Sequence, residues 1–354
     1  MKVYFYHTQD LSRIYKEWKE GIFPGHLLYG ATHLHKHGIE TIMHPYKPMY
    51  KNRLKLTFLT AWRILTCREK YDVLYASSFF GIELLVFLRA IRLYRKPIVI
   101  WHHQPIRKAN SRLRELFAKI FYRGFDHMFF FSDTLISQSL KSSKATADKM
   151  QTIHWGADLD FYDRIISDTD TAKRKGFIST GKECRDMPTL VKAFAQTDQH
   201  IDIHIAYSAG KENYKDIFSN IDLPANVTLN FINGLIPYEL SKEVSKSSCV
   251  AICCMETHYT VGLTTLVEAL ALGLPVICSR NTTFAMDIDK EKAGITVPYY
   301  DVKGWQNAIE YIATHPEEAK IMGRNGRALA ERLFNLETYS AEIAQAILKI
   351  REKK

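Results

Sequence analysis

Short apolar runs alternate with longer amphipathic stretches along the first half of the chain. The short runs are rich in β-branched and aromatic residues, which is typical of strands. They predict strands at residues 2–7, 40–44, 72–77, 97–102 and 127–132. Apolar residues at helical spacing predict helices between them, at residues 25–37, 54–70, 81–94 and 111–122. Strands that alternate with helices favour a parallel sheet with crossover helices on its faces.

A polar segment at residues 166–175 separates this series from a second one and is typical of an interdomain linker. The second series predicts strands at 176–180, 202–207, 227–231, 250–255 and 275–279, and helices at 188–196, 238–247, 264–272 and 302–314. The pattern predicts an α/β protein with two Rossmann-like, doubly wound domains, at residues 1–165 and 166–335, that face each other across a cleft. Such sheets bind ligands beyond the carboxyl ends of their strands, so the cleft is the expected site.

The composition of the 354-residue chain is that of a globular protein, with 46% hydrophobic and 24% charged residues. The most apolar stretch, residues 82–91, is too short for a membrane helix and contains Glu83 and Arg89. The N-terminus turns polar after a few residues and lacks the apolar core of a signal peptide. The six cysteines show no paired metal-ligand spacing, which favours reduced thiols. We expect a cytoplasmic protein.

The positive charge is concentrated in the first half of the chain. Residues 1–165 contain 26 Lys and Arg against 14 Asp and Glu, a net charge of +12. The remainder contains 22 basic and 24 acidic residues, a net charge of −2. This asymmetry indicates that the first half meets an anionic partner, either nucleic acid or a membrane surface.

The most informative stretch for chemistry lies at residues 255–279. A glycine-containing loop follows a buried strand there and opens a helix that carries Glu268. The backbone amides at the start of that helix, near Gly262, can hold a phosphate because a helix N-terminus carries partial positive charge. Glu268 lies one turn beyond Thr264 and Thr265 and can accept hydrogen bonds from ribose hydroxyls.

This stretch resembles the donor-site signature of the family 4 retaining glycosyltransferases, which have the GT-B fold. The family pattern "EAxAxGxPV" is matched by residues 268–276, from Glu268 to Val276. The family's first Glu falls on Thr260, and Glu256 is the nearby carboxylate, four positions earlier. The resemblance implies donor contacts from Glu256, Tyr259, Thr260, Gly262, Leu263, Thr264, Thr265 and Glu268. It also implies that a C-terminal helix, residues 336–354, packs back toward the N-terminal domain.

A second signature, at residues 179–194, contains Gly181, Lys182 and Arg185. In the family, a strand-ending Gly followed by two basic residues grips the donor diphosphate, and charge-assisted contacts of this kind are strong. A weaker match at residues 230–252 implies that Gly234 and Tyr238 line the nucleobase pocket. Residues 152–163 resemble the family's interdomain turn, and residues 129–140 its strand and helix that close the first lobe.

The first lobe supplies the candidates for the acceptor side. Residues 24–38 resemble the family's first glycine-rich loop, so Gly25 is expected near the donor phosphate and His26 on the acceptor side. Strand 97–102 ends in His102 and His103, and His103 is the better match to a family histidine near the transferred sugar. His33 and His37 share a predicted helix face, but packed or solvated histidines are favoured over a metal site. We expect no metal and no cofactor.

The predicted reaction moves a sugar from a nucleoside diphosphate to an acceptor hydroxyl. The group expected to carry the chemistry is His103, Lys182, Arg185 and Glu268, with electrostatic stabilisation of the leaving diphosphate as its main task. The family resemblance implies retention of the anomeric configuration. A GT-B sugar-nucleotide epimerase or hydrolase and a catalytically silent nucleotide-sugar-binding protein remain as alternatives. A nucleic-acid-binding function is disfavoured because no binding module for RNA or DNA is recognisable.

A basic, aromatic face is predicted on the first lobe. Its basic members are Arg53, Lys55, Arg63, Arg68, Lys70, Arg89, Arg92, Arg95, Lys96, Arg107, Lys108, Arg112, Arg114, Lys119 and Arg123. Its apolar members are Tyr46, Met49, Tyr50, Leu54, Leu56, Phe58, Leu59 and Trp62. This mixture is typical of peripheral docking on an anionic membrane. We therefore expect a saccharide or lipid-linked acceptor of surface polysaccharide or glycolipid assembly, and a location at the inner face of the membrane.

Overall fold

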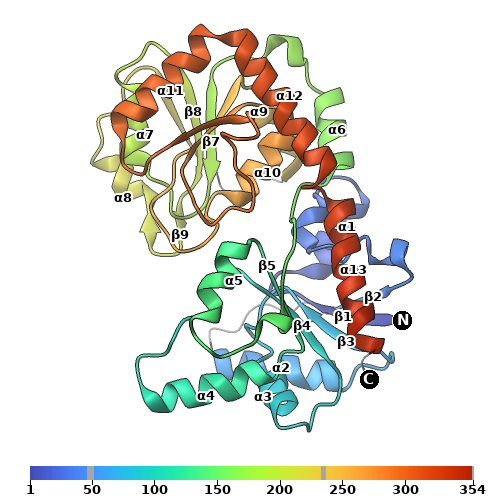
Figure 1. Ribbon diagram of the computed structural model, residues 1–354. Coiled ribbons are helices and arrows are strands. Elements are labelled where there is room, and N and C mark those ends of the chain that lie inside the picture. Colours follow the sequence, from blue (N-terminus) through green and yellow to red (C-terminus); the bar gives the residue numbers. More distant parts are fainter. Residues whose placement is uncertain (46–51, 233–236, 353–354) are drawn as a thin grey trace. The chain divides into compact units, whose positions relative to one another are not determined.

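The computed structural model describes residues 1–45, 52–232 and 237–352 and divides into two compact units. The first unit comprises Met1–Trp155 and Leu336–Lys354, and the second Gly156–Asn335 (Figure 1). Each is built on a six-stranded parallel sheet with helices between the strands, so the chain contains two Rossmann-like domains. Among the described helices, none combines the length and the apolar character that crossing a bilayer demands.

The sheet of the first unit has the strand order β2-β1-β3-β4-β5-β6. Its strands are β1 (Lys2–Tyr6), β2 (Glu40–Met43), β3 (Val73–Ala76), β4 (Ile98–His102), β5 (His127–Phe130) and β6 (Met150–Thr152). Every residue of β3 and β4 is buried, as expected for central strands covered on both faces. The first five strands confirm the apolar runs predicted from the sequence.

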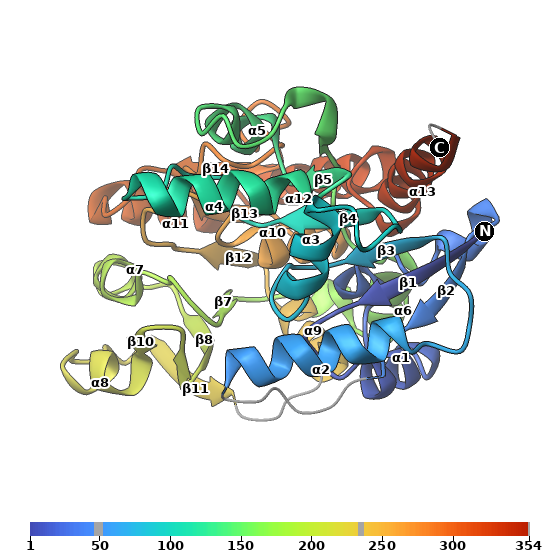
Figure 2. The ribbon, with the colours of Figure 1, turned by 90° about the horizontal axis from the view of Figure 1, so that it is seen from below.

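The described residues of this unit form six α-helices and several single turns. The helices are α1 (Leu11–Lys19), α2 (Arg53–Leu65), α3 (Glu83–Ala90), α4 (Arg112–Arg123), α5 (Asp133–Leu140) and the C-terminal α13 (Leu336–Glu352). Helices α2, α3 and α4 lie toward the viewer when the molecule is seen from below (Figure 2). Their N-cap side chains, where present, satisfy the first free backbone amides: Asn52 caps α2 and Ser111 caps α4.

The predicted helix at residues 25–37 is wrong. The segment forms two 3-10 turns, η1 (Gly25–Leu28) and η2 (Leu34–His37), with Tyr29 and Gly30 between them in the left-handed region at φ 52° and 78°. A side chain at Gly30 would press on Ser340 and Ile343 of α13 at 3.1 Å. The chain bends here because α13 packs against it, which local periodicity does not reveal.

Helix α13 is anchored to the first unit by polar contacts at three points along its length. Glu337 pairs with Lys36 of η2 at 2.5 Å. The Tyr339 hydroxyl donates to the His26 carbonyl at 3.0 Å. Glu342 accepts hydrogen bonds from the His154 backbone amide and from its imidazole, at 2.9 and 2.6 Å.

The sheet of the second unit has the order β11-β8-β7-β12-β13-β14. Its strands are β7 (Phe177–Gly181), β8 (Ile201–Ala206), β11 (Val227–Ile232), β12 (Cys249–Ile252), β13 (Val276–Ser279) and β14 (Gly294–Val297), with a two-stranded ribbon of β9 (Ser208–Ala209) and β10 (Glu212–Asn213). Its helices are α6 (Leu159–Ser167), α7 (Met187–Phe194), α8 (Tyr214–Ser219), α9 (Pro237–Ser245), α10 (Leu263–Ala271), α11 (Val302–Thr314) and α12 (Pro316–Arg332). The sequence predicted five of these strands and missed β14, a four-residue edge strand, and the two short strands β9 and β10.

The boundary between the units lies earlier than the sequence suggested. A division after residue 165 would cut α6, whereas the structure divides the chain between Trp155 and Gly156. Phe161, Tyr162 and Ile165 of α6 are buried, and α6 packs against α9 and α10 of the second unit. The polar segment 166–175 is therefore a surface connection inside the second unit.

Candidate active site

The two sequence signatures of the second unit meet at the centre of its sheet. Strands β7 and β12 are parallel neighbours there, and the chain order reverses between them, because β8 lies on one side of β7 and β12 on the other. Ligands of open α/β sheets bind beyond the carboxyl ends of the strands at such a switch point. The loop after β7 holds Lys182 and Arg185, and the loop after β12 leads to Gly262 and α10.

Backbone contacts join the two loops directly. The Asp186 amide donates to the Cys253 carbonyl at 3.1 Å, and the Met255 amide donates to the Cys184 carbonyl at 3.0 Å. Between these bonds, Arg185 and Cys254 form an antiparallel bridge. Two segments seventy residues apart in sequence thus form one local structure.

Arg185 lies inside this structure rather than on its surface. Its side chain is only 5% exposed, and Nε donates to the Thr180 carbonyl at 3.1 Å. The two terminal nitrogens contact the Glu183 carbonyl, the Cys254 sulfur and the Thr265 hydroxyl, at 3.3, 3.5 and 3.2 Å. The guanidinium therefore lies against the first turn of α10 and forms no ion pair with a carboxylate of the described residues.

Gly181 and Lys182 complete the loop after β7. A Cβ at Gly181 would lie 2.4 Å from Nε of Arg185, so the glycine makes room for the guanidinium. Lys182, in contrast, is exposed. The resemblance assigns both Lys182 and Arg185 to the donor diphosphate; in the structure Arg185 is buried and Lys182 faces solvent.

The start of α10 has no side-chain cap among the described residues. Gly262 precedes the helix at φ 89°, a conformation that favours glycine. The Leu263 amide donates to the Thr260 carbonyl and the Leu266 amide to the Gly262 carbonyl, so the amides of Thr264 and Thr265 are the first-turn donors that a ligand can use. Thr264 is exposed in this turn, whereas Leu263 and Thr265 are buried, and Thr265 is held by Arg185.

Glu268 lies one turn further along α10 and is half-buried. It is close to Tyr162 of α6, whose hydroxyl is fully buried. Burial raises the pKa of Tyr162 well above its usual range, and the charge of Glu268 raises it further. The side chain of Glu268 thus lies against Tyr162 of α6.

The loop between β12 and α10 holds the residues that depart from the family pattern. Glu256 is exposed, and its backbone amide donates to the Tyr300 hydroxyl at 3.1 Å. The Thr260 carbonyl accepts a hydrogen bond from the Leu263 amide at 3.2 Å, which closes the turn into α10. The Tyr259 hydroxyl lies 3.4 Å from the Cys184 sulfur, so this loop contacts the loop after β7 again.

Tyr238 and Gly234 are the two residues predicted for the nucleobase pocket. Tyr238, on α9, is partly exposed, and its hydroxyl donates to the Asp168 carboxylate at the end of α6. This hydrogen bond raises the pKa of Tyr238. Gly234 lies outside the described residues.

In the first unit, His102 ends β4 within an aromatic cluster. Its ring stacks on Phe130 at 5.3 Å and on Tyr122 at 5.6 Å between centroids, and the side chain is buried. Burial, and to a smaller extent the adjacent His103, lowers the pKa of His102 to about 3. No described residue forms a hydrogen bond with its buried Nε2. His102 is therefore neutral, and its packing argues against direct contact with an acceptor.

His103 has a different environment, at the carboxyl edge of the same sheet. Its Nε2 lies 3.1 Å from the Tyr29 hydroxyl, its ring stacks on Phe131, and part of it stays exposed. His7, which follows β1, also packs on Tyr29, with ring centroids 5.6 Å apart. Burial lowers the pKa of both His103 and His7 to about 4, with His103 adding to the effect on His7. A neutral imidazole can donate or accept a hydrogen bond with a sugar hydroxyl.

His7 and Tyr29 were missing from the residues chosen by sequence. The signal for His7 was present, because the first predicted strand ends on it at the same sheet edge as His103. The predicted acceptor-side residue His26 is instead fully buried: its ring packs on Trp155, and its carbonyl accepts hydrogen bonds from Trp155 and Tyr339. Gly25 is also buried, at the start of η1.

The histidines of residues 33–37 contact the protein itself. His33 lies 3.8 Å from the Glu337 carboxylate, and Nδ1 of His35 lies 2.9 Å from the Thr32 carbonyl. In the described part of the chain, no three His, Cys, Asp or Glu residues are grouped so as to hold a metal ion.

Two family models match the chain, one on each unit. The model described as Glycosyltransferase Family 4 matches residues 3–161, and the model described as Glycosyl transferases group 1 matches residues 176–329. A curated relative, D-inositol 3-phosphate glycosyltransferase of Saccharomonospora viridis, is 27% identical over 116 residues. That match spans 32% of this chain and 27% of the relative's length.

Solved structures share the fold over the whole chain. Sucrose-phosphate synthase of Thermosynechococcus elongatus has a TM-score of 0.72 at 15% identity, covering 100% of this chain and 99% of that one. A glycosyltransferase of Rickettsia africae has a TM-score of 0.70 at 14% identity, covering 100% and 99%. Anabaena HepE, solved in complex with UDP, has a TM-score of 0.67 at 16% identity, covering 99% and 100%.

Proposed function

Because this chain belongs to the family 4 glycosyltransferases of the GT-B type, we propose that it is a retaining enzyme using a nucleoside diphosphate sugar. Glycosyl transfer is the activity of the family. The proposal concerns the retention of the anomeric configuration, the nucleoside diphosphate donor and the class of acceptor. The observation that carries the proposal is the convergence of Lys182, Arg185 and the uncapped start of α10 at the switch point of the second sheet.

In the proposed reaction, the bond between the anomeric carbon and the diphosphate oxygen breaks, and the diphosphate leaves with the electron pair. The acceptor oxygen bonds to the same face of the sugar, and its proton passes to the departing phosphate. No carboxylate side chain was recognisable from the sequence as a nucleophile, which agrees with this route. The work of the protein is then mainly to stabilise the developing negative charge.

Three groups of the second unit suit that task. Lys182 is exposed, so it can contact the diphosphate directly. The amides of Thr264 and Thr265 in the first turn of α10 can donate to the phosphate oxygens. Arg185 holds Thr265 in that turn and adds a fixed positive charge from within the protein. We assign Glu268 to the ribose hydroxyls and the loop Glu256–Thr260 to the donor sugar.

We assign His103 to the acceptor side of the site. It is partly exposed at the sheet edge and is oriented by Tyr29, so it can form a hydrogen bond with the acceptor hydroxyl or the sugar. We propose a saccharide or lipid-linked acceptor of surface polysaccharide or glycolipid assembly, used at the cytoplasmic face of a membrane. No metal and no cofactor are required in this scheme.

The comparisons suggest which nucleotide to test first. HepE of Anabaena has been solved with UDP and also with UDP-glucose. Its identity to this chain is 16%, so the likeness supports the fold, and UDP enters as a proposal. The loop that departs from the family pattern, residues 256–262, is where we place the choice of donor sugar.

The proposal is tested by thermal unfolding with UDP, GDP, CDP, ADP and dTDP, each with and without Mg²⁺. A ligand that binds only the folded protein stabilises it by about 2.7 kcal/mol at one hundred times its dissociation constant. We expect a clear rise in Tm with one of the five, independent of Mg²⁺.

Lys182→Ala should abolish or strongly reduce that rise without changing the Tm of the free protein, because the Lys182 side chain is exposed. Lys192→Ala, which removes an exposed cation from α7, is the matched control and should keep the rise. If no nucleotide raises the Tm, or if both variants respond like the wild type, the donor site is wrongly assigned. A nucleotide response without any transfer or hydrolysis of the sugar would indicate the silent binding protein instead.

A further inference from the structure

Helix α4 of the first unit exposes its apolar side chains. In a soluble domain, an amphipathic helix normally turns its apolar stripe to the core. Among its twelve described residues, however, not one is fully buried. Leu113, Leu116 and Phe117, which share one helical face, are 64%, 56% and 54% exposed.

Helix α2 also exposes apolar side chains, on a face other than the one that packs against the unit. Leu56 and Ile64 are buried against the unit, as a surface helix requires. Four further apolar residues, spaced by four, four and three positions, lie on a different face and are all more than half exposed: Leu54, Phe58, Trp62 and Leu65. An exposed tryptophan and phenylalanine on one helical face have no role in the packing of this unit.

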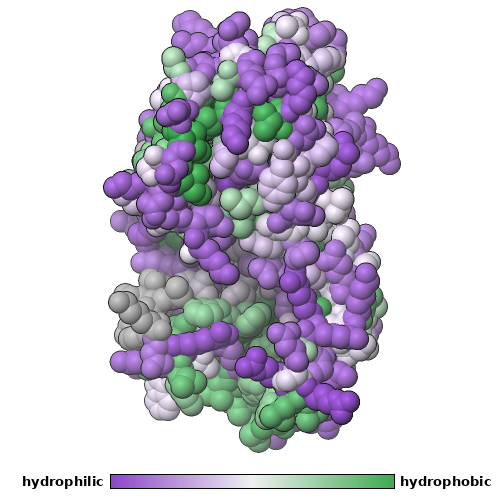
Figure 3. Space-filling model, turned by 90° about the vertical axis from the view of Figure 1, so that its left-hand side faces the viewer, coloured by the Kyte–Doolittle hydropathy of each residue, from purple (hydrophilic) through white to green (hydrophobic). Residues whose placement is uncertain are grey.

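Helix α3 lies between these two helices and packs against both. Phe87 on α3 contacts Phe121 of α4, with ring centroids 5.2 Å apart. Phe87 is itself partly exposed, and Ile91 and Leu93, which follow the helix, are largely exposed. We call the exposed apolar side chains of the three helices the docking face: Leu54, Phe58, Trp62, Leu65, Phe87, Ile91, Leu93, Leu113, Leu116 and Phe117. In Figure 3, hydrophobic surface alternates with hydrophilic residues in the lower part of the view.

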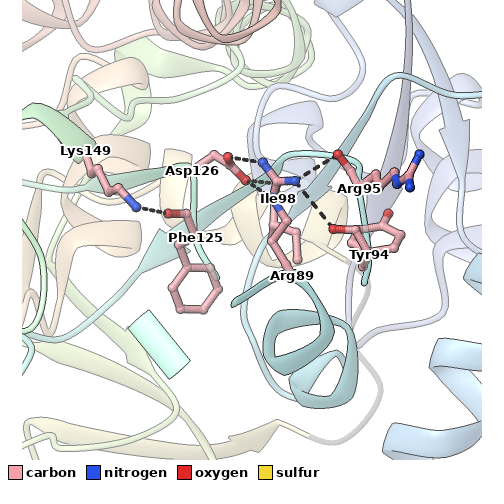
Figure 4. Close-up of polar contacts among 7 residues, drawn as sticks. All are labelled: Arg89, Tyr94, Arg95, Ile98, Phe125, Asp126 and Lys149. Atoms are coloured by element: carbon pink, nitrogen blue, oxygen red, sulfur yellow. Dashed lines mark hydrogen bonds and ion pairs between the residues drawn. The ribbon is translucent and has the colours of Figure 1, made fainter. Parts of the chain in front are cut away.

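The end of α3 is fixed by a polar network (Figure 4). Arg89 forms two hydrogen bonds with the Asp126 carboxylate, at 2.9 and 2.6 Å, and donates to the Arg95 carbonyl at 2.9 Å. Asp126 also accepts from the Ile98 amide of β4 at 2.8 Å. This network holds the segment with Ile91 and Leu93 against the sheet, so their exposure belongs to a well-anchored part of the fold. Arg89 is therefore a structural residue, although the sequence placed it on the basic face.

Positive charge is concentrated in the segment that carries the docking face. Residues 53–123 contain 15 Lys and Arg against four Asp and Glu. Arg92, Arg112, Arg114 and Arg123 are exposed, and none forms an ion pair with a described residue. Arg53, in contrast, is paired with Glu83. Tyr46, Met49 and Tyr50, assigned to this face from the sequence, lie outside the described residues.

We propose that the docking face binds the surface of an anionic lipid membrane, with its apolar side chains at the boundary of the hydrocarbon and the arginines among the headgroups. Bulky apolar side chains bordered by cations are the combination that interfacial binding uses. Nucleic acid fits less well, because it offers no hydrocarbon to Leu54, Leu65 or Leu113. A second copy of this chain also fits less well, since the same cations would face each other across the interface.

This inference is independent of the donor site, because every residue of the docking face belongs to the first unit and the donor site lies in the second. The test is flotation of the full chain with vesicles of phosphatidylcholine alone or with 30% phosphatidylglycerol, a composition chosen for the test, in low and high salt. We expect binding to the anionic vesicles in low salt, weak binding to neutral ones, and loss of part of the binding in high salt.

Two variants separate the contribution of the arginines to vesicle binding from that of the aromatic side chains. Arg112→Gln/Arg114→Gln/Arg123→Gln should weaken binding to anionic vesicles roughly a hundredfold, because each of the three removed cations loses its attraction to the lipid headgroups. Phe58→Ser/Trp62→Ser should weaken it by at least about tenfold, and this loss should persist in high salt. Both sets of side chains are exposed, so folding should be unaffected, and the nucleotide-induced rise in Tm provides a check on the second unit.

The matched control is Ile321→Ser/Arg324→Gln on α12 of the second unit, where both side chains are also exposed. It should bind vesicles like the wild type. The proposal is overturned if the wild type does not float with anionic vesicles in low salt, or if the control is impaired as much as the docking-face variants. It is also overturned if the arginine variant floats normally but no longer binds a single-stranded RNA, which would identify a nucleic-acid surface.

Discussion

At the scale of single residues, the buried histidines of the first unit are a source of acid sensitivity. His7, His44 and His102 are each less than 10% exposed, and burial lowers the pKa of each from 6.5 to between about 3 and 4. In the unfolded chain these imidazoles bind a proton near pH 6.5, so the unfolded state binds more protons between that pH and pH 4. The free energy of unfolding therefore contains the full contribution of these neutral imidazoles above pH 6.5, and this contribution is lost as the pH falls toward 4.

His102→Phe isolates one of these contributions. The substitution keeps the stack on Phe130 and removes the titrating group with its buried, unpaired Nε2. From the lowered pKa, His102 should cost the wild type about 2 kcal/mol of unfolding free energy between pH 7 and pH 5. Urea unfolding at the two pH values should show a pH dependence in the variant that is smaller by this amount. An unchanged pH dependence would mean that His102 is protonated in the folded protein.

The burial of Arg185 is a feature that the sequence motif does not predict. The motif at 179–194 located Lys182 and Arg185 in the correct loop, but spacing alone does not tell which of two cations is buried. The answer depends on Thr180, Cys254 and Thr265, which supply the acceptors that make burial of Arg185 tolerable. Cys254, in the loop after β12, and Thr265, on α10, are far from Arg185 in the sequence, so they become its neighbours only in the folded domain.

At the scale of elements, the start of α10 depends on one glycine. Gly262 has φ 89°, and a Cβ there would lie 2.9 Å from the Ile252 side chain and 3.1 Å from the Cys254 sulfur. Gly262→Ala should lower the free energy of unfolding by about 1–2 kcal/mol for the left-handed conformation alone, with the contacts adding to it. It should also displace the first turn and weaken nucleotide binding by at least about tenfold, or 1.4 kcal/mol.

Gly38→Ala is the control for the conformational part of this effect. Gly38 has φ 71°, lies in the first unit and has open space around its Cβ position. It should lose a similar amount of stability and keep its nucleotide affinity, measured by titration calorimetry. Equal nucleotide affinity in both variants would show that the start of α10 does not contact the phosphate.

Elements with a strong period were predictable, and those shaped by distant contacts were not. Helix α11 has the bounds that the sequence predicted, because its apolar residues repeat regularly and Asp301 caps its first turn. The segment 25–37 also carries apolar residues at helical spacing, but α13, some three hundred residues later, packs on Gly30, where the chain turns through the left-handed region. Strands β6 and β14 are short edge strands, whose few residues carry too little pattern to be recognised.

At the scale of the whole molecule, the chain passes between the units twice, after Trp155 and after Asn335. On the side of the second unit these two segments run side by side: the Ala157 amide donates to the Phe334 carbonyl at 3.2 Å, and Ala157 pairs with Asn335 in a parallel bridge. The sequence identified residues 152–163 as an interdomain turn by resemblance, yet composition pointed to the more polar segment 166–175. Composition misled here because a buried connection need not be polar.

The close approach of these segments depends on Gly156. A Cβ at this position would lie 1.8 Å from the carbonyl carbon and oxygen of Phe334 and 2.4 Å from the Asn335 amide nitrogen. Since these are backbone atoms, no side-chain rotation can relieve the overlap, and the two segments must separate. Gly156→Ala should therefore cost about 3 kcal/mol and break the hydrogen bond between Ala157 and Phe334.

Hydrogen exchange followed by mass spectrometry locates this loss. Peptides that cover residues 156–165 and 328–335 should exchange faster in Gly156→Ala, whereas the central strands β7 and β12 should change little. Gly176→Ala is the matched control in the same unit, because its Cβ would meet its nearest atom at an ordinary 3.4 Å and only the left-handed φ of 66° is strained. It should cost about 1 kcal/mol and leave both peptides protected. The prediction is contradicted if the two variants lose equal stability, or if exchange at 328–335 is unchanged in Gly156→Ala. Either result would mean that a side chain at residue 156 does not force the two paired segments apart.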